Sequence, residues 1–93
     1  MTAALWIAAH IELAPPALRA RALSYVQPDE SPPAEQLAAA AHRALGLVLA
    51  HEGDRSVALD LLAADGLITL ALLAKASAAP AELEAFAASL MTR

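Results

Sequence analysis

Prolines, together with Gly53, divide the apolar pattern of this chain into five segments with helical spacing. Each of the six prolines disfavours helix in the residue before it and suits a helix start. Thr2, Ser31 and Asp54 stand where helices need N-caps, and Gly53 suits a left-handed helix end. The pattern predicts helices over Thr2–Leu13, Pro16–Val26, Pro32 or Pro33 to His51, Asp54–Ala78 and Pro80–Thr92, with residues 27–33 as a proline-rich linker.

The segment Val57–Ala74 is apolar on nearly all sides. It carries only two charged residues, Asp60 and Asp65, so we expect the helix to lie in the interior. At about 100° per residue, its large side chains form two faces about 120–140° apart. One face carries Leu59, Leu62, Leu70 and Leu73 with Gly66 at its centre, and the other carries Val57, Leu61, Ile68 and Leu72.

One chain of this length is too short to enclose that helix. The helix is roughly 37 Å long and the other four add up to roughly 80 Å, whereas five or six neighbours need roughly 185–220 Å. The uncovered part is an apolar patch larger than soluble monomers usually tolerate. We therefore predict a homodimer, or a complex with another protein, whose interface is formed by Leu59, Leu62, Gly66, Leu70 and Leu73.

Gly66 has two interpretations. A glycine inside a helix costs about 1 kcal/mol relative to alanine, and a close approach of two helices can offset this cost. The approach can join two chains. Alternatively, it lies within one chain, where Gly46 on the third helix is the candidate counterpart. The sequence leaves both interpretations open.

Composition favours an all-α fold in a single domain over residues 1–93. Of the 55 apolar residues, 27 are Ala and 17 are Leu, and both residues favour helix. The β-branched and aromatic residues that favour strands are scarce. With 93 residues there is room for one core. We predict a small five-helix bundle around one long central apolar helix.

Charge and cysteine content narrow the classes of function. A net charge of −4 opposes binding to nucleic acid. The absence of cysteine removes thiol catalysis and thiolate metal sites and favours a cytosolic protein. The longest uncharged runs have nine residues, about half of what a membrane-spanning helix needs. The first 22 residues do not resemble a signal peptide, so we expect a cytoplasmic protein without a nucleic-acid or membrane partner.

The histidines do not have the spacing of a metal site. His42 and His51 lie nine positions apart and face opposite sides of their helix. His10 and Glu12 do not share a helix face either. We therefore predict no metal and no cofactor, although side chains from different helices can still converge in space.

Asp60 and Asp65 are the candidates for acid–base chemistry. They lie five positions apart, about 140° round the helix, so they do not converge from this helix alone. A carboxylate on an interior helix needs a partner. We expect each aspartate to pair with an arginine or to mark a wetter edge of the helix, and we predict no catalytic residue. The candidate arginines are Arg19, Arg21, Arg43 and Arg55.

The stretch Ala63–Ala71 resembles a late helix of trans-prenyl diphosphate synthases. The resemblance covers nine of the 93 residues. The aspartate-rich Mg²⁺ motifs on which that chemistry depends have no counterpart in this sequence. The resemblance therefore implies no such activity.

The aromatic residues and the isoleucines near the N-terminus are compatible with two functions. We expect Trp6, Ile7, Ile11 and Tyr25 to anchor the core or an interface, and the protein to be a non-catalytic, homodimeric interaction or structural module. The alternative is a binding protein for a small apolar ligand, with Trp6 at the rim of a pocket beside the leucine-rich helix. A metal-dependent enzyme is a third possibility only if histidines and aspartates meet from different helices.

Overall fold

Helix is the only regular structure in residues 2–10, 15–27, 30–51 and 53–91, which are the part of the chain that the computed structural model describes. Two 3₁₀ turns, Arg55–Val57 and Pro80–Glu82, lead into the last two helices. The all-α prediction is confirmed. The helices are α1 (Ala3–His10), α2 (Pro16–Ser24), α3 (Pro33–Ala50), α4 (Ala58–Ala78) and α5 (Leu83–Met91).

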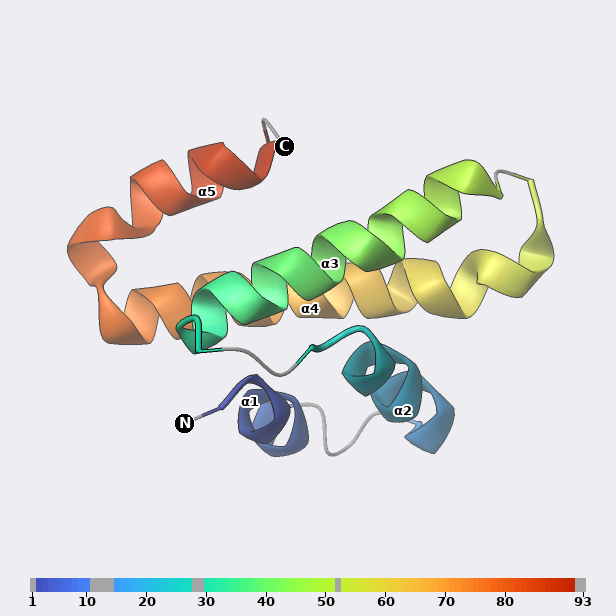
Figure 1. Ribbon diagram of the computed structural model, residues 1–93, viewed down its shortest axis with the longest axis horizontal. Helices are drawn as coiled ribbons and strands as arrows, with labels where there is room; N and C mark the ends of the chain where they lie inside the picture. Colours follow the sequence, from blue (N-terminus) through green and yellow to red (C-terminus); the bar gives the residue numbers. More distant parts are fainter. Residues whose placement is uncertain (1, 11–14, 28–29, 52, 92–93) are drawn as a thin grey trace.

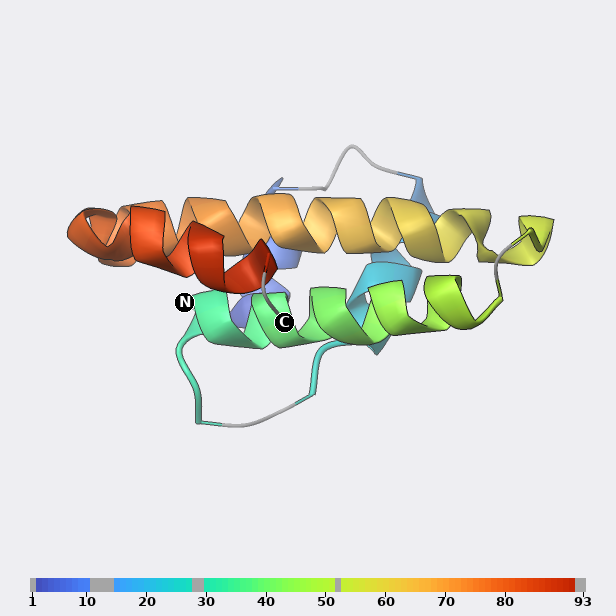
Figure 2. The same ribbon diagram turned by 90° about the horizontal axis from the view of Figure 1, so that it is seen from above.

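An antiparallel pair, α3 and α4, forms the body of the bundle (Figure 1). The helices α1 and α2 pack against one side of this pair, and α5 lies on the opposite side (Figure 2). α4 contacts each of the other four helices, and its most extensive contacts are with α3. The radius of gyration is 12.7 Å, close to the roughly 12 Å of a compact domain of this length. The prediction of a bundle around one long apolar helix is confirmed.

The core consists mainly of alanine. We call the buried alanines of α3 and α4 the alanine core. Small side chains on both helices let the two backbones approach closely. Among the described residues, the largest fully buried side chains are Leu37 and Leu67. The alanine core consists of Ala34, Ala38, Ala40, Ala41 and Ala44 of α3 and Ala63, Ala64, Ala71 and Ala74 of α4.

Because alanines form the close contact with α3, most leucines of α4 lie at the edges of the core or outside it. Leu62 is 57% exposed, Leu73 is 42% exposed and Leu61 is 51% exposed. Our expectation that α4 would be interior on both leucine faces is therefore wrong. Leu70, which is 4% exposed, is the member of the predicted interface that lies in the core.

The first two predicted N-caps have different outcomes. The hydroxyl oxygen of Thr2 accepts a hydrogen bond from the backbone N–H of Leu5 at 3.2 Å, which is the expected capping contact. Ser31 does not cap α3, because Pro32 occupies the cap position and no side chain caps it. The carbonyl oxygen of Ser31 instead accepts a hydrogen bond from the side chain of Gln36 at 2.7 Å.

The turn between α3 and α4 also shifts a predicted boundary. Gly53 has a φ of 86°, the left-handed conformation expected there. The 3₁₀ turn follows, so α4 begins at Ala58 rather than at Asp54. The prolines set the start of α2 and the end of α4 as predicted. Ile11, Glu12, Leu13, Thr92 and the linker residues Pro28 and Asp29 lie outside the described residues.

α4 also has the length and composition of a membrane-spanning helix, with a mean hydropathy of 1.6 over its most apolar stretch, of which 33% is buried. Core helices of soluble proteins meet the same criterion. Here the helix carries a buried aspartate, Asp60, and contacts every other helix of the bundle. These contacts are those of a helix that packs within a bundle, and they do not identify a cellular compartment.

Candidate functional site

Part of the predicted interface lies on the surface of α4. We call Leu59, Leu62, Gly66 and Leu73 the outer stripe. It lies about 110° round the helix from the centre of the buried face. Leu62 and Leu73 are exposed, and Leu59 and Gly66 are partly exposed. Leu70 packs in the core instead, because its helical position lies nearer to the buried face, and it is not available to a partner in this fold.

Neither glycine within a helix makes a close contact inside the chain. A Cβ atom added to Gly66 would meet no other atom within 4 Å, and the same is true of Gly46. The interpretation that Gly66 packs against Gly46 of the same chain is therefore wrong. The space above Gly66 is open, between two exposed leucines on the same side of the helix.

A polar cluster surrounds Asp60, which is only 3% exposed. Its Oδ1 atom accepts a short hydrogen bond from the hydroxyl group of Tyr25 and lies 3.5 Å from a guanidinium nitrogen of Arg21. Of the four candidate arginines, Arg21 is therefore the one that pairs with Asp60. The Nε atom of Arg43 donates a hydrogen bond of 2.9 Å to the carbonyl oxygen of Tyr25, at the end of α2. The cluster thus joins α2 to both α3 and α4.

The surroundings of Tyr25 keep its hydroxyl group protonated. Burial is the largest cause that raises the pKa of Tyr25 above the ordinary 10.0, followed by the hydrogen bond to Asp60 and by the charge of Asp60. Arg21 acts in the opposite direction. A phenol held protonated donates a stable hydrogen bond and is a poor base, so this arrangement satisfies a buried carboxylate rather than activating one.

A pocket of about 270 Å³ next to the cluster is lined by Arg21, Leu47, His51, Val57 and Asp60.

The remaining titratable candidates do not gather at one place. Asp65 is exposed, and the hydroxyl group of Thr69 donates a 3.0 Å hydrogen bond to the Asp65 carbonyl oxygen, along the predicted wetter edge. His51 is exposed, and its Nδ1 atom lies 2.9 Å from the carbonyl oxygen of Leu47. His42 lines an apolar pocket between α3, α4 and α5. Within the described ranges, no three His, Cys, Asp or Glu side chains are close enough together to hold a metal ion. The side chain of His10 lies outside the described part.

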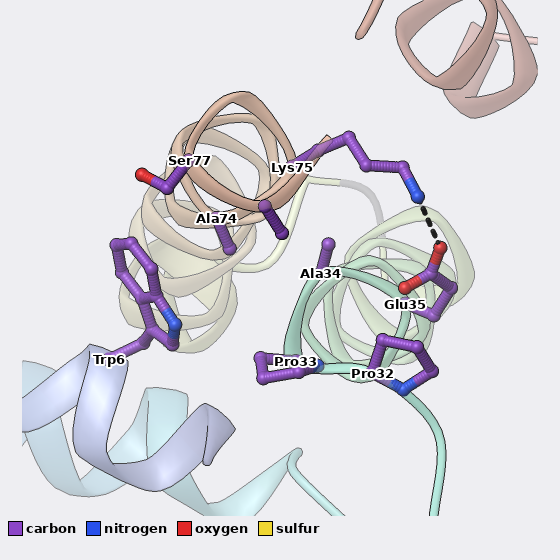
Figure 3. Close-up of a pocket in the computed structure, with 9 residues that line it drawn as sticks. Trp6, Pro32, Pro33, Ala34, Glu35, Ala74, Lys75 and Ser77 are labelled. Atoms are coloured by element: carbon purple, nitrogen blue, oxygen red, sulfur yellow. Dashed lines mark hydrogen bonds and ion pairs between the residues drawn. The ribbon is translucent and has the colours of Figure 1, made fainter. Parts of the chain in front are cut away.

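A second pocket, of about 290 Å³, lies between α1, the start of α3 and the end of α4. Figure 3 shows Trp6 on one side of it, Ala74 and Ala34 deeper inside, and an ion pair between Glu35 and Lys75 on the other side. This is the place where the sequence puts the alternative apolar-ligand site. Ile7, in contrast, is a core residue, and Ile11 lies outside the described residues.

Lys75 connects three helices. Its Nζ atom donates a hydrogen bond of 2.8 Å to Glu35 of α3 and lies 5.1 Å from the centre of the Phe86 ring of α5. The hydrogen bond to Glu35 is the main cause that raises the pKa of Lys75. This contact has no signal in the sequence, because Glu35 and Lys75 are 40 positions apart. The contact of Tyr25 with Asp60 has one weak signal, since a tyrosine in or near a core usually needs a hydrogen-bond partner.

Known proteins give no family for this chain. No family model, no curated protein and no solved structure matches it at a significant level. A function is therefore proposed from the residues described above.

Proposed function

We propose that this chain is a non-catalytic interaction module that forms a homodimer through the outer stripe of α4. The observation that supports this most is Gly66. It lies in the middle of a 21-residue helix, costs about 1 kcal/mol relative to alanine, and makes no close contact inside the chain. A second helix that crosses over Gly66 would offset that cost and cover Leu62 and Leu73.

The size of the exposed stripe suggests a weak dimer. Burying an exposed leucine completely gains about 1.5–3 kcal/mol, and the two stripes would contribute four exposed leucines that are already partly covered. Association costs about 4–15 kcal/mol in lost freedom of motion, which is as large as this gain or larger, so these leucines alone support at most weak association. We expect a dimer that dissociates on dilution. The lack of cysteine supports a cytoplasmic location for it.

The test is the solution mass, measured by light scattering across a dilution series. Wild type should shift from dimer to monomer as it is diluted. Leu62→Glu should remain monomeric at every concentration, because it would bury a charge in the interface. The matched control is Leu49→Glu on α3, since Leu49 is 61% exposed and Leu62 is 57% exposed.

Two results would contradict the homodimer. One is a wild-type monomer at all concentrations. The other is an equal loss of dimer in Leu62→Glu and Leu49→Glu, which would indicate a general effect of charge. Leu70→Asp is not a suitable variant, because Leu70 lies in the core and its replacement would unfold the chain.

A second candidate function is the binding of a small apolar ligand beside Trp6. The pocket there, of about 290 Å³, is near the lower limit of roughly 300 Å³ for small-molecule sites. Trp6 is the only tryptophan in the chain, so its fluorescence reports on this pocket alone. Titration with decanoic acid should shift the fluorescence in wild type but not in Ser77→Leu, which fills the pocket from its exposed rim. An unchanged spectrum in both proteins would remove this candidate.

A further inference from the structure

The leucines of α4 are placed symmetrically about Gly66. Leu59 and Leu73 each lie seven residues from Gly66, and Leu62 and Leu70 each lie four residues from it. The spacing therefore reads the same in both directions along the helix. All five residues belong to one uninterrupted helix, so the symmetry in sequence is also a symmetry of the backbone positions, whereas the side chain of Leu70 turns into the core.

This symmetry matters for one of the two ways in which two identical helices can pair. In a parallel pair each residue meets its own copy, so no symmetry along the helix is needed. In an antiparallel pair whose two-fold axis passes Gly66, a residue before Gly66 meets the residue equally far after it. Leu59 then faces the partner's Leu73, and leucine meets leucine at both ends of the contact.

The inward position of Leu70 is compatible with the antiparallel pair. Leu62 would face the partner's position 70, where the side chain is turned into the partner's own core. Together with the open space at Gly66, this leaves a hole on the helix surface for the exposed side chain of Leu62. The helix surface thus has a protruding leucine four residues before Gly66, at Leu62, and a recess four residues after it, at Leu70, followed by the exposed Leu73.

The helix dipoles favour the same arrangement. Neighbouring antiparallel helices place the positive end of one dipole beside the negative end of the other, whereas parallel helices place like ends together. The outer stripe itself carries no charged residue, so no charge repulsion lies between the paired leucines.

We propose that the α4 helices of two copies of this chain cross in antiparallel orientation, with the two-fold axis at Gly66. This rests on the proposed function, because it assumes that the outer stripe is the dimer interface. It goes further by assigning residues to each other across that interface. Leu59 pairs with the partner's Leu73, and Leu62 packs beside the partner's Gly66.

Disulfide trapping tests the pairing cleanly, because the chain contains no cysteine. In the antiparallel dimer, the two copies of position 73 lie roughly 21 Å apart along the helices, too far for a disulfide, which requires Cα atoms within about 7 Å. Leu73→Cys alone should therefore not cross-link under mild oxidation. A mixture of Leu73→Cys with ¹⁵N-labelled Leu59→Cys should give a disulfide whose mass contains one copy of each.

Two single-cysteine controls complete the experiment. Gly66→Cys lies on the two-fold axis and should cross-link to itself, at a protein concentration high enough to compensate for the weaker association that a side chain at the helix crossing causes. Leu49→Cys, exposed on α3 and outside the stripe, measures random collisions. A nitroxide label on Leu73→Cys gives a second measurement that does not depend on the folding of Leu59→Cys. Pulsed dipolar spectroscopy should give a separation of roughly 20 Å or more in the antiparallel dimer and about 10 Å in a parallel one.

The contrary outcomes distinguish failure of the antiparallel pairing from failure of the homodimer itself. Self-cross-linking of Leu73→Cys above the Leu49→Cys background, or a short label distance, would overturn the antiparallel pairing and leave the homodimer through the stripe in place. Self-cross-linking of Gly66→Cys with no mixed product would also overturn the pairing, since the helices would then cross at a steep angle. A dimer in which no stripe cysteine cross-links, or a monomer in light scattering, would overturn the proposed function as well.

Discussion

The two sides of α4 depart from the usual pattern of large apolar residues inside and small ones outside. The inner side buries four alanines together with Leu67 and Leu70, and the outer side exposes the leucines Leu62 and Leu73. Both residue types are apolar, so hydrophobicity alone does not decide which side is buried. Packing against the rest of the bundle decides it: small side chains on α3 and α4 allow a close approach of the two helices, and Leu67 and Leu70 are the leucines of α4 that are buried.

This arrangement concentrates the apolar stabilisation in few residues. A buried alanine side chain removes about one carbon from water, worth about 0.8 kcal/mol, whereas a buried leucine gains about 1.5–3 kcal/mol. Leu37 and Leu67 are the large side chains that are completely buried among the described residues. Residue for residue, they should therefore contribute more to the stability of the domain than any core alanine, while the leucines of the outer stripe contribute little to it.

The largest expected effect is the loss of Leu67. Leu67→Ala leaves a cavity in the alanine core and should lower the free energy of unfolding by about 2–5 kcal/mol. Leu62→Ala, on the exposed side of the same helix, should change it by about 0.5 kcal/mol or less. Urea unfolding at a concentration where the chain is monomeric measures both. Equal effects of the two substitutions would contradict the contrast between the two sides of α4.

An added side chain on the inner side tests the close approach directly. Ala71 is buried against the core, so Ala71→Leu should push α3 and α4 apart and destabilise the domain by about 1–3 kcal/mol. Ala58→Leu, at the exposed start of α4, is the matched control and should be close to neutral. The measurement is again the free energy of unfolding. A neutral Ala71→Leu would mean that the core has room for leucine.

The polar contacts of α4 should also contribute unequally to stability, more on the buried side of the helix than on the exposed side. Tyr25→Phe removes the hydrogen bond to the buried Asp60 and should cost about 1–2 kcal/mol, because the carboxylate loses a donor that water does not replace. Thr69→Val removes a hydroxyl hydrogen bond on the exposed side and should cost about 0.5 kcal/mol or less. Thermal unfolding of the two variants measures the difference.

The same tyrosine gives a pH dependence with a definite sign. The pKa of Tyr25 is raised in the folded protein, so its contribution to stability is complete below pH 10.0, the ordinary pKa, and is lost as the pH rises through the higher folded-state pKa. Tyr25 is the only tyrosine, so tyrosinate absorbance follows its titration without interference. The absorbance midpoint should lie above 10.0 in the folded protein. Tyr25→Phe should reduce the alkaline loss of stability without abolishing it, because the pKa of Lys75 is raised as well. A tyrosinate midpoint at or below 10.0 would contradict the contact with Asp60.

The helices could be predicted from local signals, whereas the face of α4 that is buried could not. Proline restricts the residue before it, and this effect needs no tertiary contact, so Pro16 and Pro80 mark boundaries correctly. The burial of α4 depends on what α3 presents to it, and a count of large side chains on α4 does not include that. Asp60 could be predicted to need an arginine, but the choice of Arg21 depends on how α2 crosses α4.

The smallest expected effect separates the outer stripe from an ordinary surface. Gly46→Ala and Gly66→Ala each add a methyl group where no atom lies within 4 Å, and each should stabilise the monomer by up to about 1 kcal/mol through helix propensity. In the dimer, the added Cβ of Gly66→Ala lies at the helix crossing and should weaken association, while Gly46→Ala should leave it unchanged. One substitution then has opposite effects on folding and on dimerisation.

Urea unfolding of the diluted protein and light scattering of the concentrated protein measure the two effects separately. If Gly66→Ala stabilises the fold and the dimer fraction matches that of Gly46→Ala at every concentration, the outer stripe is an ordinary surface.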